Sequence, residues 1–315
     1  MNSSAEHSAE NKKPAQYDLT AEYKGGSVDY TVIEGYSENN PALIIPGFTE
    51  GRFVLDSFAQ SLNNQGDRTV IFPDQPQIDK RKTKLSIIDQ HAEALLAIVE
   101  KEGLGQIPLD IITHSFGSLV AVRAAELAKD KGVTSFDHNE GSNAIFITPA
   151  GSNDKENLLF LGGRWVIFLK NGMAYGKELD PTGEMMKAGV KNFNKNLSKT
   201  IKETIALGKK STIYENLGEV GLRPFVFGYA SDDMYPHKVI KSIIKEGGEA
   251  LDGYGVPIDT GGVGAGTFEE FKEKTGLAGK NAKKAWAHHY RNAGHNDLLF
   301  HPERTVKAIL QVIDR

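Results

Sequence analysis

The segment Leu109–Val122, LDIITHSFGSLVAV, joins a run of apolar residues to the start of an apolar helical pattern. We expect the run to be a buried strand and the pattern to be a helix, with only Thr113–Gly117 between them. Open α/β sheets bind ligands at the carboxyl edge, so this connection places Ser115 at that edge. Such a tight turn predicts a strained backbone at Ser115, which requires small neighbours, and Gly117 and Ser118 meet that need on the helix side.

Further short strands are predicted by the same signature, a continuously apolar run that ends at a turn. They lie at residues 42–45, 69–72, 144–147 and 224–227. A strand that is apolar on both faces must be covered by helices on both sides, which is typical of parallel sheets. Helical periodicity lies between the strands, at residues 53–63, 86–102 and 116–129. The alternation predicts an α/β fold with a mostly parallel, doubly wound sheet and flanking helices.

The amino-terminal part of the chain departs from this alternation. Residues 1–16 are polar and have almost nothing to bury, so we expect a disordered tail. Two strand-like stretches follow, at residues 17–23 and 27–34, and Lys24-Gly25-Gly26 between them is typical of a hairpin turn. An antiparallel hairpin near the amino terminus is compatible with the predicted sheet.

Two later stretches interrupt the alternation. Residues 151–222 lack short buried strands but contain apolar residues at helical spacing within 184–210. We therefore expect residues 151–222 to form a helical cap inserted into one α/β core made of residues 17–150 and 223–315. Residues 247–285 are rich in glycine, and we expect a long loop there.

The composition excludes several classes of protein. The 37 basic and 41 acidic side chains give a net charge of −4, which argues against a nucleic-acid-binding protein. Cysteine is absent, which excludes disulfides, cysteine-bearing zinc sites, iron–sulfur clusters and a thiol nucleophile. No apolar run approaches the roughly 18 residues of a membrane span, and the polar amino terminus has no signal-peptide core. We expect a cytoplasmic protein with no nucleic-acid partner and no membrane contact.

The turn at Ser115 resembles the nucleophile elbow of the α/β-hydrolase superfamily, whose pattern is Gly-x-Ser-x-Gly, with Thr113 in place of the first glycine. This resemblance implies that Ser115 is a nucleophile activated by a histidine, which an acid orients, in the chain order Ser, acid, His. The loop that follows residues 224–227 resembles the family's acid loop. It implies Asp232 as the acid, with the adjacent Asp233 as the alternative.

Two more motifs complete the resemblance. Asn292–Asp297 precedes a closing helix predicted at 302–314, as the family's Gly-His motif does, which implies His295 as the base. Ile45–Thr49 resembles the family's glycine-containing oxyanion loop, which implies the Phe48 N–H as one oxyanion donor and the Phe116 N–H as the other. The family's chemistry requires no cofactor and no metal ion.

Other histidines and other chemistries fit the sequence less well than this assignment. The rival bases are His91, His237, His288, His289 and His301. His91 lies inside a predicted helix, and His114 is next to the nucleophile rather than behind it. A metal site of His288, His289 and His295 is disfavoured, because adjacent strand residues point to opposite faces. The lysine-rich face of the 184–210 helix would suit an anionic membrane, but a cap helix with solvated lysines is the simpler interpretation.

Together these observations predict a serine hydrolase that cleaves a carboxylic ester of a partly apolar small molecule through an acyl-enzyme. The cap at 151–222 would select the apolar group. The alternatives are a carbon–carbon bond hydrolase or an acyltransferase with the same triad, and a non-catalytic module that keeps only a ligand pocket.

Overall fold

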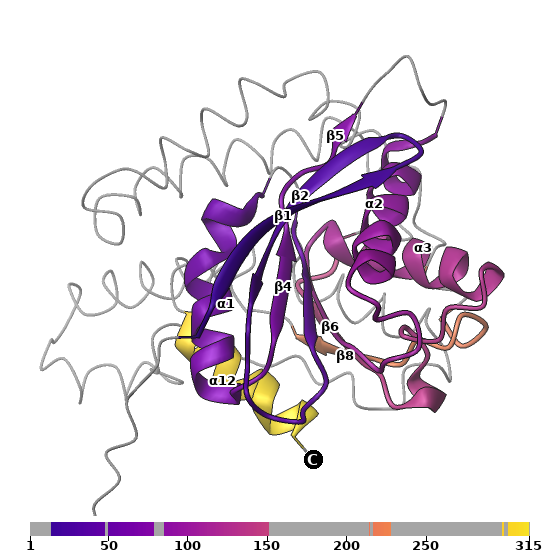
Figure 1. Cartoon of the computed structure of the whole chain (residues 1–315). Coiled ribbons are helices and arrows are strands. Elements are labelled where there is room, and N and C mark those ends of the chain that lie inside the picture. The colour runs from indigo at the N-terminus through magenta and orange to yellow at the C-terminus, as the bar shows by residue number, and fades with distance from the viewer. Residues whose placement is uncertain are drawn as a thin grey trace, which may run out of the picture.

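The computed structural model describes residues 14–47, 50–78, 85–150, 214, 217–227, 298 and 302–314 (Figure 1). Within these residues the chain forms an eight-stranded sheet with helices against both faces. The strands are β1 Gln16–Tyr23, β2 Gly26–Ile33, β3 Ala42–Ile45, β4 Val70–Pro73, β5 Gln77–Ile78, β6 Asp110–His114, β7 Asn143–Ile147 and β8 Pro224–Phe227. The helices are α1 Arg52–Gly66, α2 Ile87–Lys101, α3 Gly117–Asp130 and α12 Pro302–Ile313, with a short 3-10 helix, η1, at His138–Glu140.

The predicted strands and helices that fall within the described residues are confirmed, and their ends differ from the predicted ones by at most three residues. Gln16, predicted to belong to the tail, instead begins β1, because it pairs with Ile33 in the antiparallel ladder of the hairpin. Most of the predicted cap and all of the glycine-rich loop at 247–285 lie outside the described residues. No helix of the described part of the chain is both long and apolar enough to cross a membrane.

The sheet order is β1-β2-β4-β3-β6-β7-β8, and β5 pairs with β2. The strands from β4 to β8 in this order run parallel, whereas β2 is antiparallel to both β1 and β4. From β3 the chain moves to β4 on one side, then returns past β3 to β6 on the other. The strand order therefore reverses between β3 and β6, and a reversal of this kind marks where open α/β sheets bind ligands.

Alternate residues of the central strands bury opposite faces of the sheet. In β3, Leu43 and Ile45 pack into the core under α2 and α3, whereas Ala42 and Ile44 pack into the core under α1 and α12. Figure 1 shows these two helical layers on either side of the strands. The continuous apolarity of β3 is thus explained by its burial on both faces.

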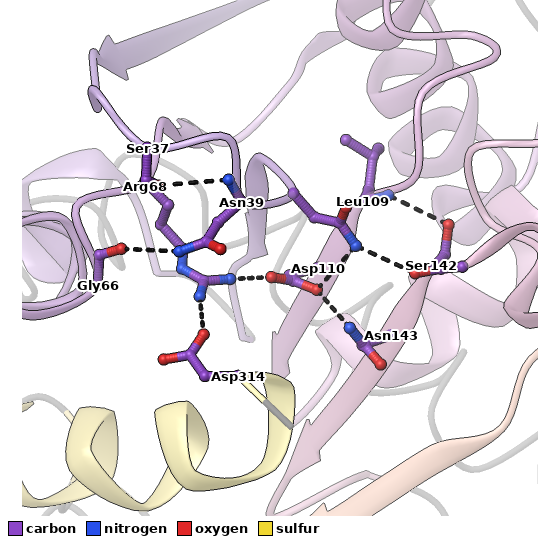
Figure 2. A network of polar contacts seen from close by, with 11 residues as sticks. Ser37, Asn39, Gly66, Arg68, Leu109, Asp110, Ser142, Asn143 and Asp314 are labelled. Atoms are coloured by element: carbon purple, nitrogen blue, oxygen red, sulfur yellow. Dashed lines mark hydrogen bonds and ion pairs between the residues drawn. The ribbon is translucent and has the colours of Figure 1, made fainter.

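A buried polar network lies at the amino edge of the sheet, where β6 begins (Figure 2). The guanidinium of Arg68 pairs with Asp110 in β6 and with Asp314 after α12, and the Arg68 and Asp110 side chains are each only 1% exposed. The Asn143 side-chain amide donates to Asp110 at 2.7 Å. Burial raises the pKa of Asp110 to about 6, because desolvation outweighs the hydrogen bond from Asn143 and the charge of Arg68. This network fastens the last helix to the central strand.

Candidate active site

Ser115 occupies the turn between β6 and α3 with a φ of +50°, in the left-handed region that non-glycine residues rarely adopt. The strained turn expected from the sequence is therefore confirmed. The end of β7 and the residues after it support this turn, because the Ser115 N–H donates to the Ile147 carbonyl at 2.9 Å and the Ser115 carbonyl accepts the Ala150 N–H at 3.0 Å. This geometry places the serine at the carboxyl end of β6, beside the end of β3, where the strand order reverses.

A second strained residue lies at the same edge of the sheet. Thr148, directly after β7, has a φ of +43°, which is a genuine outlier for a β-branched side chain. Its hydroxyl and that of Thr113 are buried and lack a hydrogen-bond partner in the described structure. Strain and unsatisfied polar groups concentrate where a structure serves a function. The strain and the unsatisfied hydroxyls therefore indicate that the candidate functional site lies at the carboxyl edge of β6 and β7.

Gly117 allows α3 to begin against the end of β3. A Cβ atom at this position would lie 2.4 Å from the Ile45 carbonyl oxygen and 2.8 Å from that of Pro46. Both obstacles are backbone atoms, so no side-chain rotation relieves the clash. The elbow and the loop that follows β3 are thereby packed in direct contact.

Replacing Gly117 with alanine is expected to lower the free energy of unfolding by about 1–3 kcal/mol, the usual range for overpacking. Urea unfolding followed by circular dichroism measures this loss. Gly105→Ala is the matched control, because a Cβ atom at Gly105 has no neighbour closer than 4.0 Å. An equal change in the two variants would show that the close approach at Gly117 is unimportant.

Phe116 lies between Ser115 and the first residue of α3, and its side chain is buried. The imidazole of His91, in α2, meets its ring edge-on with the ring centroids 5.4 Å apart. His91 was one rival for the catalytic base, and the structure instead places it in the core beneath the elbow, as its predicted helical position implied. Its contact holds the Phe116 ring and so steadies the turn that carries the Phe116 N–H.

The His114 side chain contacts Glu50, a residue that sequence reasoning missed. Its Nδ1 atom lies 2.7 Å from Glu50 Oε1, and the other carboxylate oxygen, Oε2, accepts the Gly47 N–H at 2.5 Å. Glu50 therefore connects the residue before Ser115 to the loop after β3. The only signal in the sequence was an acid three residues after Gly47.

Tyr214 is the second residue that sequence reasoning missed. Its hydroxyl donates to the Ala150 carbonyl and lies 2.6 Å from Ser118 Oγ, which is itself 2.7 Å from the Ser115 carbonyl. The Tyr214 ring is buried against Phe146, with the ring centroids 6.2 Å apart. The end of the predicted cap region is thus anchored directly to the elbow.

The remaining predicted site residues lie outside the described residues, namely Phe48, Asp232, Asp233, His295 and the rivals His237, His288, His289 and His301. The strand that leads to Asp232, β8, pairs in parallel with β7 and ends at Phe227 on the same edge as Ser115. Leu298, three residues after His295, is buried in the core cluster that α1 and α12 share. In the described ranges no three His, Asp or Glu side chains gather as a metal site would require.

Comparison with solved structures shows which fold this chain has. No protein-family model matches the chain, and no curated protein sequence does either. Among solved structures, 2-hydroxy-6-oxo-6-phenylhexa-2,4-dienoate hydrolase from Rhodococcus sp. strain RHA1 matches with a TM-score of 0.59 at 12% identity, covering 96% of this chain and 100% of that one. A haloalkane dehalogenase variant from Bradyrhizobium elkanii matches at 0.55 and 12% identity, covering 95% and 97%. An esterase from Pyrobaculum calidifontis matches at 0.51 and 14% identity, covering 95% and 84%.

Proposed function

We propose that this chain, which has the α/β-hydrolase fold, is a serine hydrolase that cleaves a carboxylic ester of a partly apolar small molecule. The observation that carries the proposal is the left-handed Ser115 between β6 and α3, at the reversal of strand order beside β3. A serine held in this way lies at the N-terminus of a helix, α3, whose free N–H groups favour the negative charge that develops when a nucleophile attacks a carbonyl. A non-catalytic ligand pocket gives no reason for the strain.

In the proposed mechanism, His295 takes the proton of Ser115 as its Oγ attacks the ester carbonyl carbon. Asp232 orients His295 and stabilises its protonated form. The N–H groups of Phe48 and Phe116 stabilise the negative charge on the carbonyl oxygen. His295 then protonates the departing alcohol, which leaves an acyl-enzyme. Water, deprotonated by His295, attacks the acyl carbon and releases the acid and free Ser115.

A fluorophosphonate probe tests the class of enzyme, because it phosphonylates only an activated serine. We expect labelling of the wild type and of Ser57→Ala, which removes an exposed serine from α1, and no labelling of Ser115→Ala. A folded wild type that does not react would overturn the serine-hydrolase proposal and favour the binding module.

A series of p-nitrophenyl esters of increasing acyl chain length then tests the ester assignment. We expect kcat/KM to rise with chain length up to an optimum, by roughly tenfold for each one or two methylene groups buried. A labelled enzyme that cleaves none of these esters would favour the carbon–carbon hydrolase or acyltransferase alternative.

A further inference from the structure

We propose that Glu50 is a positioning residue for the oxyanion hole, because it fastens the loop that carries Phe48 to the residue preceding the nucleophile. The inference rests on the proposed function, since it assigns Glu50 a part in stabilising the oxyanion. In this role the Glu50 carboxylate does not touch the substrate and acts through the backbone of the loop.

The two oxygens of the Glu50 carboxylate have separate partners on two different strand ends. Oε2 accepts the Gly47 N–H at 2.5 Å, and Oε1 lies 2.7 Å from His114 Nδ1. A carboxylate only accepts hydrogen bonds, so Nδ1 carries the proton in this contact. The side chains of Glu50 and His114 are 10% and 1% exposed, and charge-assisted hydrogen bonds are strengthened by such burial.

The loop is closed on its other side by Gln75, which follows β4. Its side-chain amide donates to the Glu50 carbonyl and, at 3.4 Å, to the Gly47 carbonyl. The Glu50 N–H also donates to the Gly47 carbonyl, at 3.3 Å, so a backbone hydrogen bond spans the two residues between them. Both polar groups of the Gly47 backbone are therefore held, the N–H by the carboxylate and the carbonyl by two donors.

Only glycine fits at position 47 in this arrangement. A Cβ atom there would lie 2.8 Å from Glu50 Oε2 and 2.9 Å from His114 Nδ1. The glycine, the carboxylate and the imidazole thus form one packed unit. Gly47 serves this contact as well as the turn that the sequence predicted for it.

The consequence for the oxyanion hole follows from the planarity of the peptide bond. The Gly47 carbonyl and the Phe48 N–H belong to the same peptide unit, and in a trans peptide they point in opposite directions. Whatever orients the Gly47 carbonyl therefore also orients the Phe48 N–H. An oxyanion donor must lie within about 2.7–3.1 Å of the developing charge, so a small rotation of this peptide removes its contribution. The second contact of Glu50 is to His114, the residue before Ser115. It therefore fixes the position of this peptide relative to Ser115.

The variants Glu50→Ala and Glu50→Gln separate positioning from mere stability. In Glu50→Gln the amide oxygen still accepts the Gly47 N–H, and the amide NH₂ donates to His114 in its other neutral tautomer. We expect Glu50→Ala to lower kcat by about 10–100-fold with KM changed less than about threefold, and Glu50→Gln to recover at least about a third of the wild-type kcat. Rates are measured on p-nitrophenyl esters and divided by the concentration of sites that the fluorophosphonate labels, so unfolded protein does not count.

The matched control is Glu93→Ala, which removes a carboxylate that pairs with Lys131 at 2.8 Å on the α2–α3 surface. It should keep the wild-type kcat. If Glu50→Ala fails to fold, Gln75→Ala removes one of the two donors to the Gly47 carbonyl and is expected to lower kcat about 3–10-fold at constant KM.

Three outcomes would overturn the inference about Glu50. The first is that Glu50→Ala keeps the wild-type kcat per labelled site. The second is that Glu50→Gln loses as much kcat as Glu50→Ala does. The third, which applies if Glu50→Ala does not fold, is that Gln75→Ala keeps the wild-type kcat. Each leaves the proposed function intact, because the wild type still labels and turns over. A wild type that neither labels nor cleaves the esters would instead overturn the proposed function, and with it the role of Glu50.

Discussion

Replacing Ser115 with alanine is expected to lower kcat for ester hydrolysis by at least about 10⁴-fold. In the proposed mechanism the hydroxyl oxygen is the atom that bonds to the substrate, so without it no acyl-enzyme forms, and only binding and the oxyanion donors remain. Alanine keeps the Cβ atom and so leaves the packing of the turn unchanged. The measurement is steady-state hydrolysis of the best p-nitrophenyl ester, with far-UV circular dichroism to show that the variant is folded. A folded variant that retains a tenth of the activity would exclude Ser115 as the nucleophile.

The same assay distinguishes the two candidate acids. The acid keeps the histidine in the correct tautomer, and its loss lowers kcat by about 10⁴-fold in serine proteases with the same kind of triad. We expect Asp232→Asn to show a loss of this order and Asp233→Asn to stay within about tenfold of the wild type. The reverse result would transfer the role to Asp233. Because the members of a triad act as a unit, combining Asp232→Asn with Ser115→Ala should add almost nothing to the loss.

Replacing Arg68 with methionine is expected to lower the free energy of unfolding by about 3–5 kcal/mol at about pH 7. The arginine and Asp110 side chains are each 1% exposed, so the variant leaves the Asp110 carboxylate buried without its cation. Urea unfolding at equilibrium measures the loss. Arg52→Met is the matched control, because Arg52 pairs with Asp18 at 2.8 Å where the side chains are 26% and 70% exposed, and such pairs contribute under about 1 kcal/mol.

The loss in Arg68→Met should depend on pH, and the sign follows from Asp110. Its pKa in the folded protein is about 6, above the value of 3.8 for a free side chain, so the folded state retains a proton that the unfolded state releases between these values. The stability that this group contributes is therefore full below about pH 4 and is lost as the pH rises through about 6. At about pH 5 Asp110 is mostly neutral, so the loss in Arg68→Met should be less than half of that at about pH 7. A loss that is equal at both pH values would show that the cost does not come from a buried charge.

The sequence predicts the covered strands because each carries its own evidence, a short apolar run that ends at a turn. Ala42–Ile45 is the clearest case, since burial on both faces leaves no polar position in the strand. The elbow was predicted for a similar reason, because Ser115 and the small residues after it are neighbours in the chain. Local patterns of this kind can be recognised in a single sequence.

The polar contacts around the elbow leave no such local trace. Glu50 meets His114 across 64 residues, and Tyr214 meets Ser118 across 96. Both pairs form only in the folded chain, where the loop after β3 lies beside the end of β6 and Tyr214 packs next to α3. Nothing in the periodicity around either residue distinguishes it from an ordinary surface acid or a core tyrosine. The same holds for Arg68, whose partners are 42 and 246 residues away.

The Arg68 network and the strained serine lie at opposite ends of β6. Substitutions that reshape the loops after β3, β7 and β8 therefore leave the contacts of Arg68 and Asp110 untouched. This separation suits directed evolution, in which altered specificity usually costs stability. Libraries should vary the loops at the carboxyl edge, while thermostabilising changes are sought at the amino edge, where they can be accumulated beforehand without disturbing turnover.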